Sequence, residues 1–308
     1  MTKTAEIAAK DAADGISAVA EEAEEIAVEE ATGLSPRLIY EVVRREGEEE
    51  LARPLRSLAY SGVAAGIMIS FSVLGEAIFR TYLPDAPWRH LVENLGYSLG
   101  FLLVIIGRMQ LFTENVITTV LPLMARPTSR IFWQVARLWA LVLGANVLGA
   151  FFIAAVFAYT PAIQEELRPA LLALSEHATT MPPWQGFVRG IPAGILIAAI
   201  VWMQPSGEEA RFFIILTFTW LIAAGDFTHI VAGSVEMAYM IWTGHMGAGG
   251  AVFGFFLPVL AGNVVGGTVI FTLMAWGQVK DEVLRDRKRR QERRHREWME
   301  RRRARKAG

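Results

Sequence analysis

The sequence predicts an all-α polytopic membrane protein with six transmembrane helices, and three observations support this fold class. Hydrophobic residues make up 53% of the 308 residues and charged residues only 20%, with a mean hydropathy of +0.34. Soluble domains carry about 25% charged residues, so this composition favours a chain that lies largely in lipid. Six windows reach the length of about 20 apolar residues that a hydrocarbon core requires, and two of them are interrupted.

The six windows follow one another with short connections. Their ranges in order are 58–79, 95–124, 132–159, 187–203, 212–242 and 248–276. The second window is interrupted by the polar stretch 108–115 and the fifth by 225–229, whereas the third is continuous. We therefore expect a transmembrane domain over residues 51–278 in which helices 2 and 5 are broken.

Charge is concentrated outside this domain. Residues 1–50 carry 14 Asp and Glu against 5 Lys and Arg, whereas 278–308 carry 14 Lys and Arg against 6 Asp and Glu. Basic residues in short loops favour the cytoplasmic side, and an even number of spans places both termini on one side. The sequence thus predicts an acidic cytoplasmic N-tail over 1–50 and a basic cytoplasmic C-tail over 279–308.

Recurring patterns indicate an internal repeat. The segment GVAAG at 62–66 in the first span matches GIPAG at 190–194 in the fourth, and Asn146 in the third span lies in a segment similar to that of Asn263 in the sixth. Three spans in each half give the halves opposite orientations, so we expect an inverted 3+3 repeat. Glycines at this spacing also let helices pack closely in lipid, which explains most of them without any functional role.

The two interruptions predict one central pathway. Backbone that leaves a helix at membrane depth has polar groups that lipid cannot satisfy, so it occurs only inside the protein or beside a cavity. Half-helices that begin at such breaks direct the positive ends of their dipoles to the centre, which favours an anion. Asn146 and Asn263 are candidates to hydrogen-bond the broken backbone, although ordinary contacts between helices explain them about as well.

Three motifs carry a resemblance to a known family. They are LFTENVIT at 111–118 in the second span, Phe227-Thr228-His229 at the break in the fifth, and GNVVG at 262–266 in the sixth. In order and position they resemble the formate/nitrite transporter family. The resemblance implies an aquaporin-like protomer, a homopentamer in the bacterial inner (plasma) membrane, and one pore per protomer for a small monovalent anion such as formate or nitrite, or for its weak acid. It implies no cofactor.

The resemblance also assigns residues of the pore. His229 matches the family's central histidine between two hydrophobic constrictions, and Leu111, Phe112 and Thr113 match the loop of the inner constriction. Without the motif, a lone membrane histidine is more often a contact between helices. The expected pore lining is completed by Glu114, Asn115, Phe227 and Thr228. Supporting roles are expected for Asn146, Asn263, Arg108 and Asp226.

Several positions depart from the family pattern. Gly194 and Gly233 stand where Asn is usual, and no Lys or Arg occurs near 177–179, where a lysine that collects anions is expected. Glu114 follows Leu-Phe-Thr where small or polar residues are commoner. An ionised carboxylate repels an anion by roughly 4 kcal/mol at about 4 Å and an effective dielectric near 20. Arg108 is a candidate partner for Glu114; if Glu114 is unpaired, a neutral or cationic solute such as ammonia or ammonium becomes the alternative substrate.

The sequence argues against an enzyme, because it has no cysteine, no histidine cluster with metal-ligand spacing and no phosphate-binding glycine loop. Three classes remain: a pore for small anions or weak acids, a pore of the same fold for a neutral or cationic solute, and a non-transporting membrane anchor. The anchor is disfavoured, because it gives no reason for two broken helices. A small-molecule substrate and membrane lipid are the expected partners, and nucleic acid is not. Glu236, seven residues beyond His229, is expected near the outer interface without a role.

Overall fold

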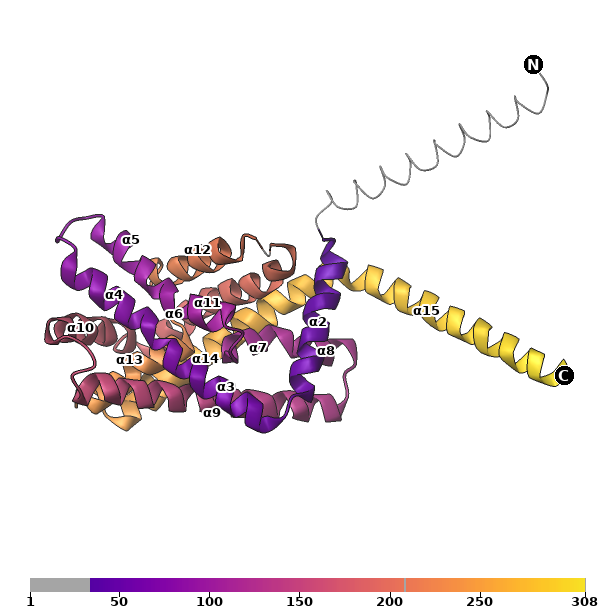
Figure 1. Ribbon diagram of the computed structural model, residues 1–308, viewed down its shortest axis with the longest axis horizontal. Coiled ribbons are helices and arrows are strands. Elements are labelled where there is room, and N and C mark those ends of the chain that lie inside the picture. Colours follow the sequence, from indigo (N-terminus) through magenta and orange to yellow (C-terminus); the bar gives the residue numbers. More distant parts are fainter. Residues whose placement is uncertain (1–33, 208, 308) are drawn as a thin grey trace, which may run out of the picture.

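The computed structural model describes residues 34–207 and 209–307, and over these ranges the chain is all-helical, as predicted (Figure 1). The α-helices are α2 Pro36–Ala52, α3 Leu55–Met68, α4 Ser70–Tyr82, α5 Arg89–Glu93, α6 Ser98–Ile106, α7 Phe112–Thr118, α8 Val120–Ala125, α9 Ser129–Tyr159, α10 Arg168–Thr179, α11 Pro183–Met203, α12 Arg211–Ala224, α13 Ile230–Trp242, α14 Leu257–Val264 and α15 Leu273–Ala307. Short 3-10 turns occur at Asn94–Tyr97, Glu165–Leu167 and Gln204–Ser206. Two π-helical segments, Gly250–Phe256 and Val265–Thr272, flank α14.

Helices of membrane-spanning length dominate the bundle. In the part of the chain that the structure describes, five helical stretches are long and apolar enough to cross a membrane: Leu55–Tyr82, Arg89–Ile106, Ser129–Tyr159, Pro183–Ser206 and Gly250–Arg285. The shorter apolar helices α12 and α13 lie where the sequence predicts the fifth span. The count of six spans depends on taking α12 and α13 together, and it stays a prediction.

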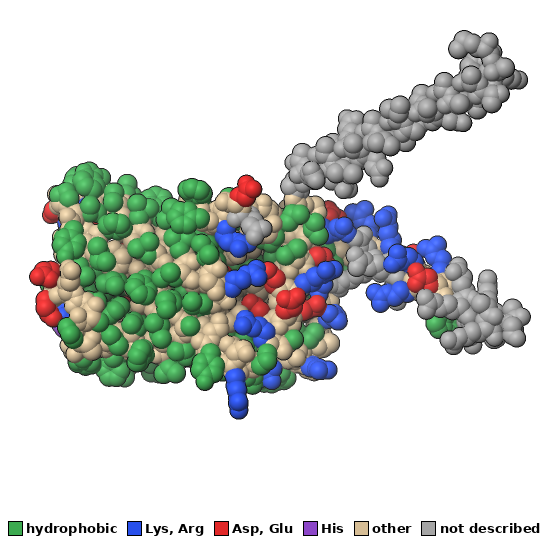
Figure 2. Space-filling view, viewed as in Figure 1, with side chains coloured by type: hydrophobic (Ala, Val, Ile, Leu, Met, Phe, Trp, Pro, Cys, Tyr) green, Lys and Arg blue, Asp and Glu red, His purple; other side chains and the backbone are tan. Residues whose placement is uncertain are grey.

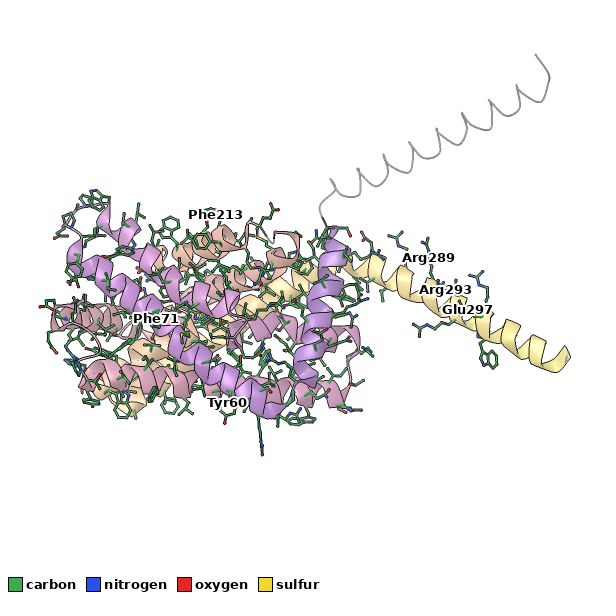
Figure 3. The ribbon with its side chains drawn as sticks, in the orientation of Figure 1. Tyr60, Phe71, Phe213, Arg289, Arg293 and Glu297 are labelled. Atoms are coloured by element: carbon green, nitrogen blue, oxygen red, sulfur yellow. The ribbon has the colours of Figure 1, made fainter. Side chains whose placement is uncertain are left out.

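An apolar surface surrounds the bundle. Figure 2 shows hydrophobic side chains over most of the visible body, while charged side chains gather at the end where α2 and the start of α15 lie. Tyr60 and Phe213 lie near the edges of the body in Figure 3, and the exposed fractions of Tyr60, Phe71 and Phe213 are 80%, 40% and 65%. Large apolar side chains exposed over a whole body are unusual in a water-soluble protein and fit a bundle surrounded by lipid.

The chain leaves the helical conformation between α6 and α7 and again between α12 and α13. Each gap contains one non-glycine residue with positive φ, Arg108 at 51° and Asp226 at 53°. This region is uncommon for residues with a Cβ atom, so it marks a sharp local turn. Both gaps fall where the sequence predicts the interruptions of spans two and five.

Close backbone contacts position the helices beside the gaps. Helix α3 packs along α9, and α11 packs along α14. A Cβ atom at Gly66 would overlap the backbone oxygen of Asn146, and one at Gly194 would overlap the backbone oxygen of Asn263. Gly194 therefore has a structural reason at a position where the family resemblance leads us to expect Asn: the approach of α14 leaves no room for any side chain.

Helix α2 packs against the bundle and does not extend from it. It contacts α7, α8, α11 and α15, and Tyr40 and Val43 are fully buried. A Cβ atom at Gly47 would overlap the backbone oxygen of Thr118 at the end of α7. The predicted tail boundary at residue 50 thus falls inside a packed helix, and the boundary at 278/279 falls inside α15. Residues 1–33 of the predicted N-tail lie outside the described residues.

Candidate functional site

Two cavities approach the interruptions from opposite ends of the bundle. The first, here called the α2-side cavity, has a volume of about 400 Å³, and its lining includes Glu46, Glu50, Arg108, Gln110, Glu114 and Gln204. The second, the α10-side cavity, has a volume of about 370 Å³, and its lining includes Glu76, Tyr97, His177, Phe227, His229 and Glu236. The two linings have no residue in common. The two cavities are therefore separate, and the buried region between them is here called the closed centre.

His229 lies at the inner end of the α10-side cavity and is only 2% exposed. It is the N-cap of α13, and its Nδ1 accepts a hydrogen bond from the N–H of Ala232 at 3.3 Å. An accepting Nδ1 carries no proton, so this geometry assigns the proton of the neutral imidazole to Nε2. Nε2 lies 2.7 Å from Oγ1 of Thr113 and donates to it.

The bond between His229 and Thr113 joins two parts of the chain that are 116 positions apart. It connects the start of α13 with the first turn of α7, so the two half-helices meet at this pair. Because the Thr113 hydroxyl accepts from the imidazole, its own proton remains available to a solute or to another acceptor. The arrangement places one hydrogen-bond donor and one acceptor at the closed centre.

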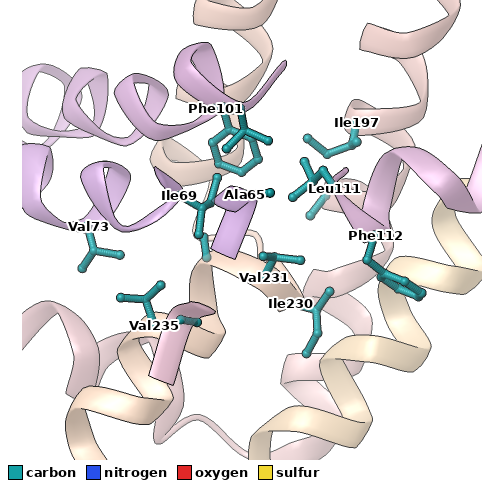
Figure 4. Close-up of a cluster of buried hydrophobic side chains, with 14 of the residues drawn as sticks. Ala65, Ile69, Val73, Phe101, Leu111, Phe112, Ile197, Ile230, Val231 and Val235 are labelled. Atoms are coloured by element: carbon teal, nitrogen blue, oxygen red, sulfur yellow. The ribbon is translucent and has the colours of Figure 1, made fainter. Parts of the chain in front are cut away.

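Apolar side chains enclose this pair. The Phe101 ring packs edge-on against the His229 imidazole, with 4.9 Å between ring centroids. Leu111 and Ile197 are fully buried and lie beside Phe101 in Figure 4. Phe112 instead contacts Trp139 of α9, with centroids 5.7 Å apart, and lines neither cavity. Of the motif's apolar residues, Leu111 lies at the closed centre and Phe112 faces a neighbouring helix.

Asn146 of α9 holds the backbone of the first gap. Its Oδ1 accepts from the N–H of Phe112 at 2.9 Å, and its Nδ2 donates to the carbonyl of Gln110 at 2.9 Å. The same Nδ2 donates to the carbonyl of Gly62 in α3 at 2.8 Å. One side chain thus satisfies polar backbone groups within the gap and at the start of α7, which lipid cannot do.

Asn263 of α14 makes the equivalent bonds at the second gap. Its Oδ1 accepts from the N–H of Ile230 at 2.8 Å, and its Nδ2 donates to the carbonyls of Thr228 and Gly190 at 2.8 and 2.9 Å. The two asparagines therefore act in the same way on corresponding gaps. These contacts favour a supporting role over the alternative of ordinary contacts between helices.

Glu114 faces the α2-side cavity, and its carboxyl group interacts with the side chain of Gln204. Arg108, the candidate partner of Glu114, instead pairs with Glu46 of α2 at 3.6 Å. The ion pair between Arg108 and Glu114, which the sequence left open, is therefore not formed, because the sharp turn at Arg108 directs its side chain toward α2, where it is 74% exposed. Glu114 has no ion-pair partner among the described residues.

Glu50 connects α2 with the first gap. Its carboxylate accepts hydrogen bonds from Oγ1 of Thr118 at 2.8 Å, Nδ2 of Asn115 at 3.0 Å and Nε2 of Gln110 at 3.4 Å. Asn115, expected to line the pore, is 1% exposed and is absent from both cavity linings. Its amide contacts α2 instead.

The contact of Glu50 with α7 should depend on pH. Burial raises the pKa of the Glu50 carboxyl group, which lies outside the membrane-spanning helices, although its hydrogen bonds with Thr118 and Gln110 act in the opposite direction. The packed state then binds a proton more readily than the released state, so packing of α2 is strongest below the ordinary pKa and weakens as pH rises through the raised value. Hydrogen-exchange protection factors of α2 amides should fall over this range.

Glu50→Gln should remove this pH dependence, because an amide does not titrate. Glu49→Gln, a matched change at an exposed position of the same helix, should keep it. Protection factors in the wild type that do not change with pH would contradict the assignment of this contact to Glu50.

Asp226 lies at the wall of the α10-side cavity, where two basic groups contact it. Its carboxylate is 3.3 Å from the guanidinium of Arg189 and 3.0 Å from Nε2 of His177. Phe227 and Thr228 line the same cavity, and Oγ1 of Thr228 donates to a carbonyl of α11 at 2.8 Å. Asp226 is thus a paired residue at the wall of the cavity, which suits a supporting role.

Two more carboxyl groups lie deeper in this cavity. Glu76 of α4 is 5% exposed and Glu236 of α13 is 7% exposed, and both line the cavity. The sequence placed Glu236 near the outer interface without a role; in the structure α13 turns this side chain into the cavity, and its depth in the membrane stays a prediction. A Cβ atom at Gly233 would overlap the Phe255 ring, so an aromatic ring occupies the space where the resemblance leads us to expect Asn.

Sequence reasoning missed Glu50, Glu76, Phe101 and Gln204. Glu76 lies within the first apolar window, so the rule that carboxylates inside the membrane are functional candidates could have found it. The other three are brought to the site by packing between helices, for which the sequence has no local signal. In the described part of the chain, no group of three or more His, Asp or Glu residues is placed to hold a metal ion.

An all-α membrane fold in which two interrupted helices meet between two cavities is the arrangement of a membrane channel or transporter. The family model described as formate/nitrite transporter matches residues 37–277. The chain belongs to the formate/nitrite transporter family, whose members are channels and transporters.

Individual relatives agree with this assignment. The inner membrane protein YfdC of Escherichia coli (strain K12) is 42% identical over 250 residues, covering 81% of each chain. The formate channel FocA of Haemophilus influenzae is 30% identical over 243 residues, covering 70% of this chain and 84% of FocA. A solved structure of a pentameric formate channel with formate bound has a TM-score of 0.61 at 23% identity, covering 76% of this chain and 97% of that one.

Proposed function

We propose that this protein is a pore for a small solute that crosses the closed centre in its neutral form, with a weak acid of the formate class as the first candidate. The observation that carries the proposal is the bond between His229 and Thr113 at 2.7 Å, in an apolar enclosure between two cavities. A charge at this depth costs several kcal/mol, whereas a neutral molecule avoids most of that cost. The two side chains offer the donor and acceptor that a small acid needs.

The proposal includes a membrane architecture. Taken together, α12 and α13 complete six spans, which form two inverted halves with both termini on the cytoplasmic side and assemble as a homopentamer. Support comes from the equivalent bonds of Asn146 and Asn263 and from the positive φ of Arg108 and Asp226 at corresponding gaps. The pentamer is supported by the similar fold of a pentameric formate channel. Native mass spectrometry of the purified protein tests the number of copies.

A weak base such as ammonia, in equilibrium with ammonium, is the second candidate, and the charge of the cavities favours it. The α2-side cavity is lined by four carboxylates and two arginines, and the α10-side cavity by four carboxylates and one arginine. Where the carboxyl groups without an ion-pair partner are ionised, an anion that enters meets an excess of negative charge, whereas a cation is attracted. His229 and Thr113 serve a neutral amine as well as a neutral acid, because both form hydrogen bonds.

Flux into proteoliposomes separates the two candidates. Labelled formate, nitrite, lactate and methylamine are compared across a pH series. Flux of a weak acid through the pore should rise as pH falls, because its neutral fraction grows, and flux of a weak base should rise as pH rises. A pore that passes none of these solutes faster than empty liposomes would contradict the proposal.

Replacing Glu114 by Gln should raise formate flux by about tenfold near neutral pH if the carboxylate is ionised, since loss of about 1.4 kcal/mol of repulsion corresponds to this factor. The reason is that Glu114 lines the α2-side cavity without an ion-pair partner among the described residues. The same proteoliposome assay measures the effect. Glu282→Gln, an exposed change on α15, serves as the control and should leave flux unchanged. A lower formate flux in Glu114→Gln would mean that Glu114 assists passage.

A further inference from the structure

Two buried carboxyl groups in the α10-side cavity have no partner. Glu76 and Glu236 are 95% and 93% buried, and both line the cavity. Neither side chain forms a hydrogen bond or an ion pair within the described residues, and the two groups are close enough to interact electrostatically. Glu236 lies two turns, about 10 Å along the helix axis, beyond His229 on the same half-helix, and both residues line this cavity.

The other carboxylates of the cavity are neutralised by neighbours. Glu93 is 3.4 Å from the guanidinium groups of both Arg80 and Arg89. Asp226 is matched by Arg189 and His177, as described above. Arg80 is the basic residue that acts on Glu76, but its ion pair is with Glu93. The charges at the wall of the cavity are therefore balanced, and the deep pair is not.

A buried pair of carboxyl groups must be neutralised, either by protons or by a cation. When both groups are ionised, a cation has to supply the opposite charge. Two ionised carboxylates in one water-poor cavity repel each other, and charges this deeply buried are stable only when they are paired. The lining of the cavity also includes the aromatic residues Tyr97, Phe227 and Phe255. Aromatic faces attract cations, and ammonium groups above all.

We propose that Glu76 and Glu236 form a binding site for a small monovalent cation of the ammonium class. This inference deepens the proposed function and rests on it in one respect, which is that the cavity is an entrance to the pore. It favours the weak base as the substrate. An ammonium ion donates hydrogen bonds to both carboxylates and contacts the aromatic lining. Divalent ions require more oxygen ligands, and among the described residues no group of three or more His, Asp or Glu is placed to hold a metal ion.

A cation site of this kind would also oppose the entry of an anion into this cavity. A formate ion that approaches His229 through this cavity passes the unpaired carboxylates of Glu76 and Glu236. Like charges raise the free energy of the anion in the cavity, whereas methylammonium is attracted to the same position. The cavity is thus selective before the closed centre is reached.

Isothermal titration calorimetry of the purified wild-type protein with methylammonium chloride tests the site. The buffer cation is N-methylglucamine, because its sugar chain is too bulky to reach carboxyl groups that are buried this deeply. Potassium chloride and N-methylglucamine formate are titrated in parallel. We expect saturable binding of methylammonium and none of formate. Glu76→Gln and Glu236→Gln should each raise the Kd at least about tenfold, which is the effect of losing about 1.4 kcal/mol. Glu176→Gln, a matched change on exposed α10 that lines neither cavity, should not.

Two results would overturn the proposal. Absence of saturable methylammonium binding, or an unchanged Kd in both variants, would show that the pair holds no cation. Potassium binding of equal affinity with the same dependence on both glutamates would show that the site does not take the ammonium class. Binding is measured without flux, so loss of this inference leaves the proposed pore intact. Conversely, binding without passage of any solute would reject the pore and keep the site.

A wild-type measurement covers the case in which the variants do not fold. Dicyclohexylcarbodiimide modifies buried carboxyl groups, and mass spectrometry of peptides locates the modified residues. Methylammonium should slow modification of Glu76 and Glu236 and leave that of Glu114, in the other cavity, unchanged. Modification of Glu76 and Glu236 at the same rate with and without methylammonium would count against the site.

Discussion

Substitution of His229 by Asn is expected to lower solute flux by about ten- to a hundredfold and to remove its dependence on pH. A hydrogen bond to a charged or strongly polar solute contributes about 1.5 to 3 kcal/mol. Loss of this free energy corresponds to a fall in flux of about ten- to a hundredfold. The shorter Asn side chain cannot replace the Nε2 that lies 2.7 Å from Thr113. Flux into proteoliposomes over a pH series measures both effects.

The variant should fold normally, because Asn is a preferred N-cap residue and its side chain can accept from the N–H of Ala232, as Nδ1 of His229 does. Oligomer recovery after purification checks this. His245→Asn is a matched control, since His245 is exposed and lies outside both cavity linings. If His229→Asn transports like the wild type at every pH, the histidine does not take part in passage, and the proposed role of the central pair fails.

Replacement of Asn146 by Leu is expected to destabilise the protein by about 3 kcal/mol, because it leaves three backbone groups without their partner at roughly 1 kcal/mol each. The groups are the N–H of Phe112 and the carbonyls of Gln110 and Gly62. For a chain of this size the loss corresponds to a drop in Tm of about 6 to 12 °C. Thermal unfolding of the purified protein, followed by tryptophan fluorescence, measures it.

Asn263→Leu should give a loss of similar size, since its three bonds are equivalent. Gln134→Leu is the control on α9, because the Gln134 side chain makes no hydrogen bond within the described residues. A Tm for Asn146→Leu equal to that of the control would mean that the first gap is held by packing alone. A low Tm in one asparagine variant and not in the other would argue against equivalent halves.

The sequence by itself determined the membrane class, the family and the location of the two gaps. Each of these rests on information that is local in the chain. An apolar window of about 20 residues specifies a span, and short motifs such as 111–118 or 227–229 identify the family. The gaps at Arg108 and Asp226 follow from polar residues within apolar windows.

Which side chains meet was decided only by the tertiary structure. Thr113 and His229 are 116 positions apart, and neither window specifies which face of one half-helix meets the other. Arg108 reaches Glu46 because its backbone turn points toward α2, a helix that the sequence analysis placed in a soluble tail. The inward direction of Glu236 depends on the rotation of α13, which periodicity cannot show in a helix that is apolar on nearly all sides. Pairing, burial and charge balance depend on the lateral packing of helices. The charges of the two cavities, unlike the fold, could therefore be determined only from the structure.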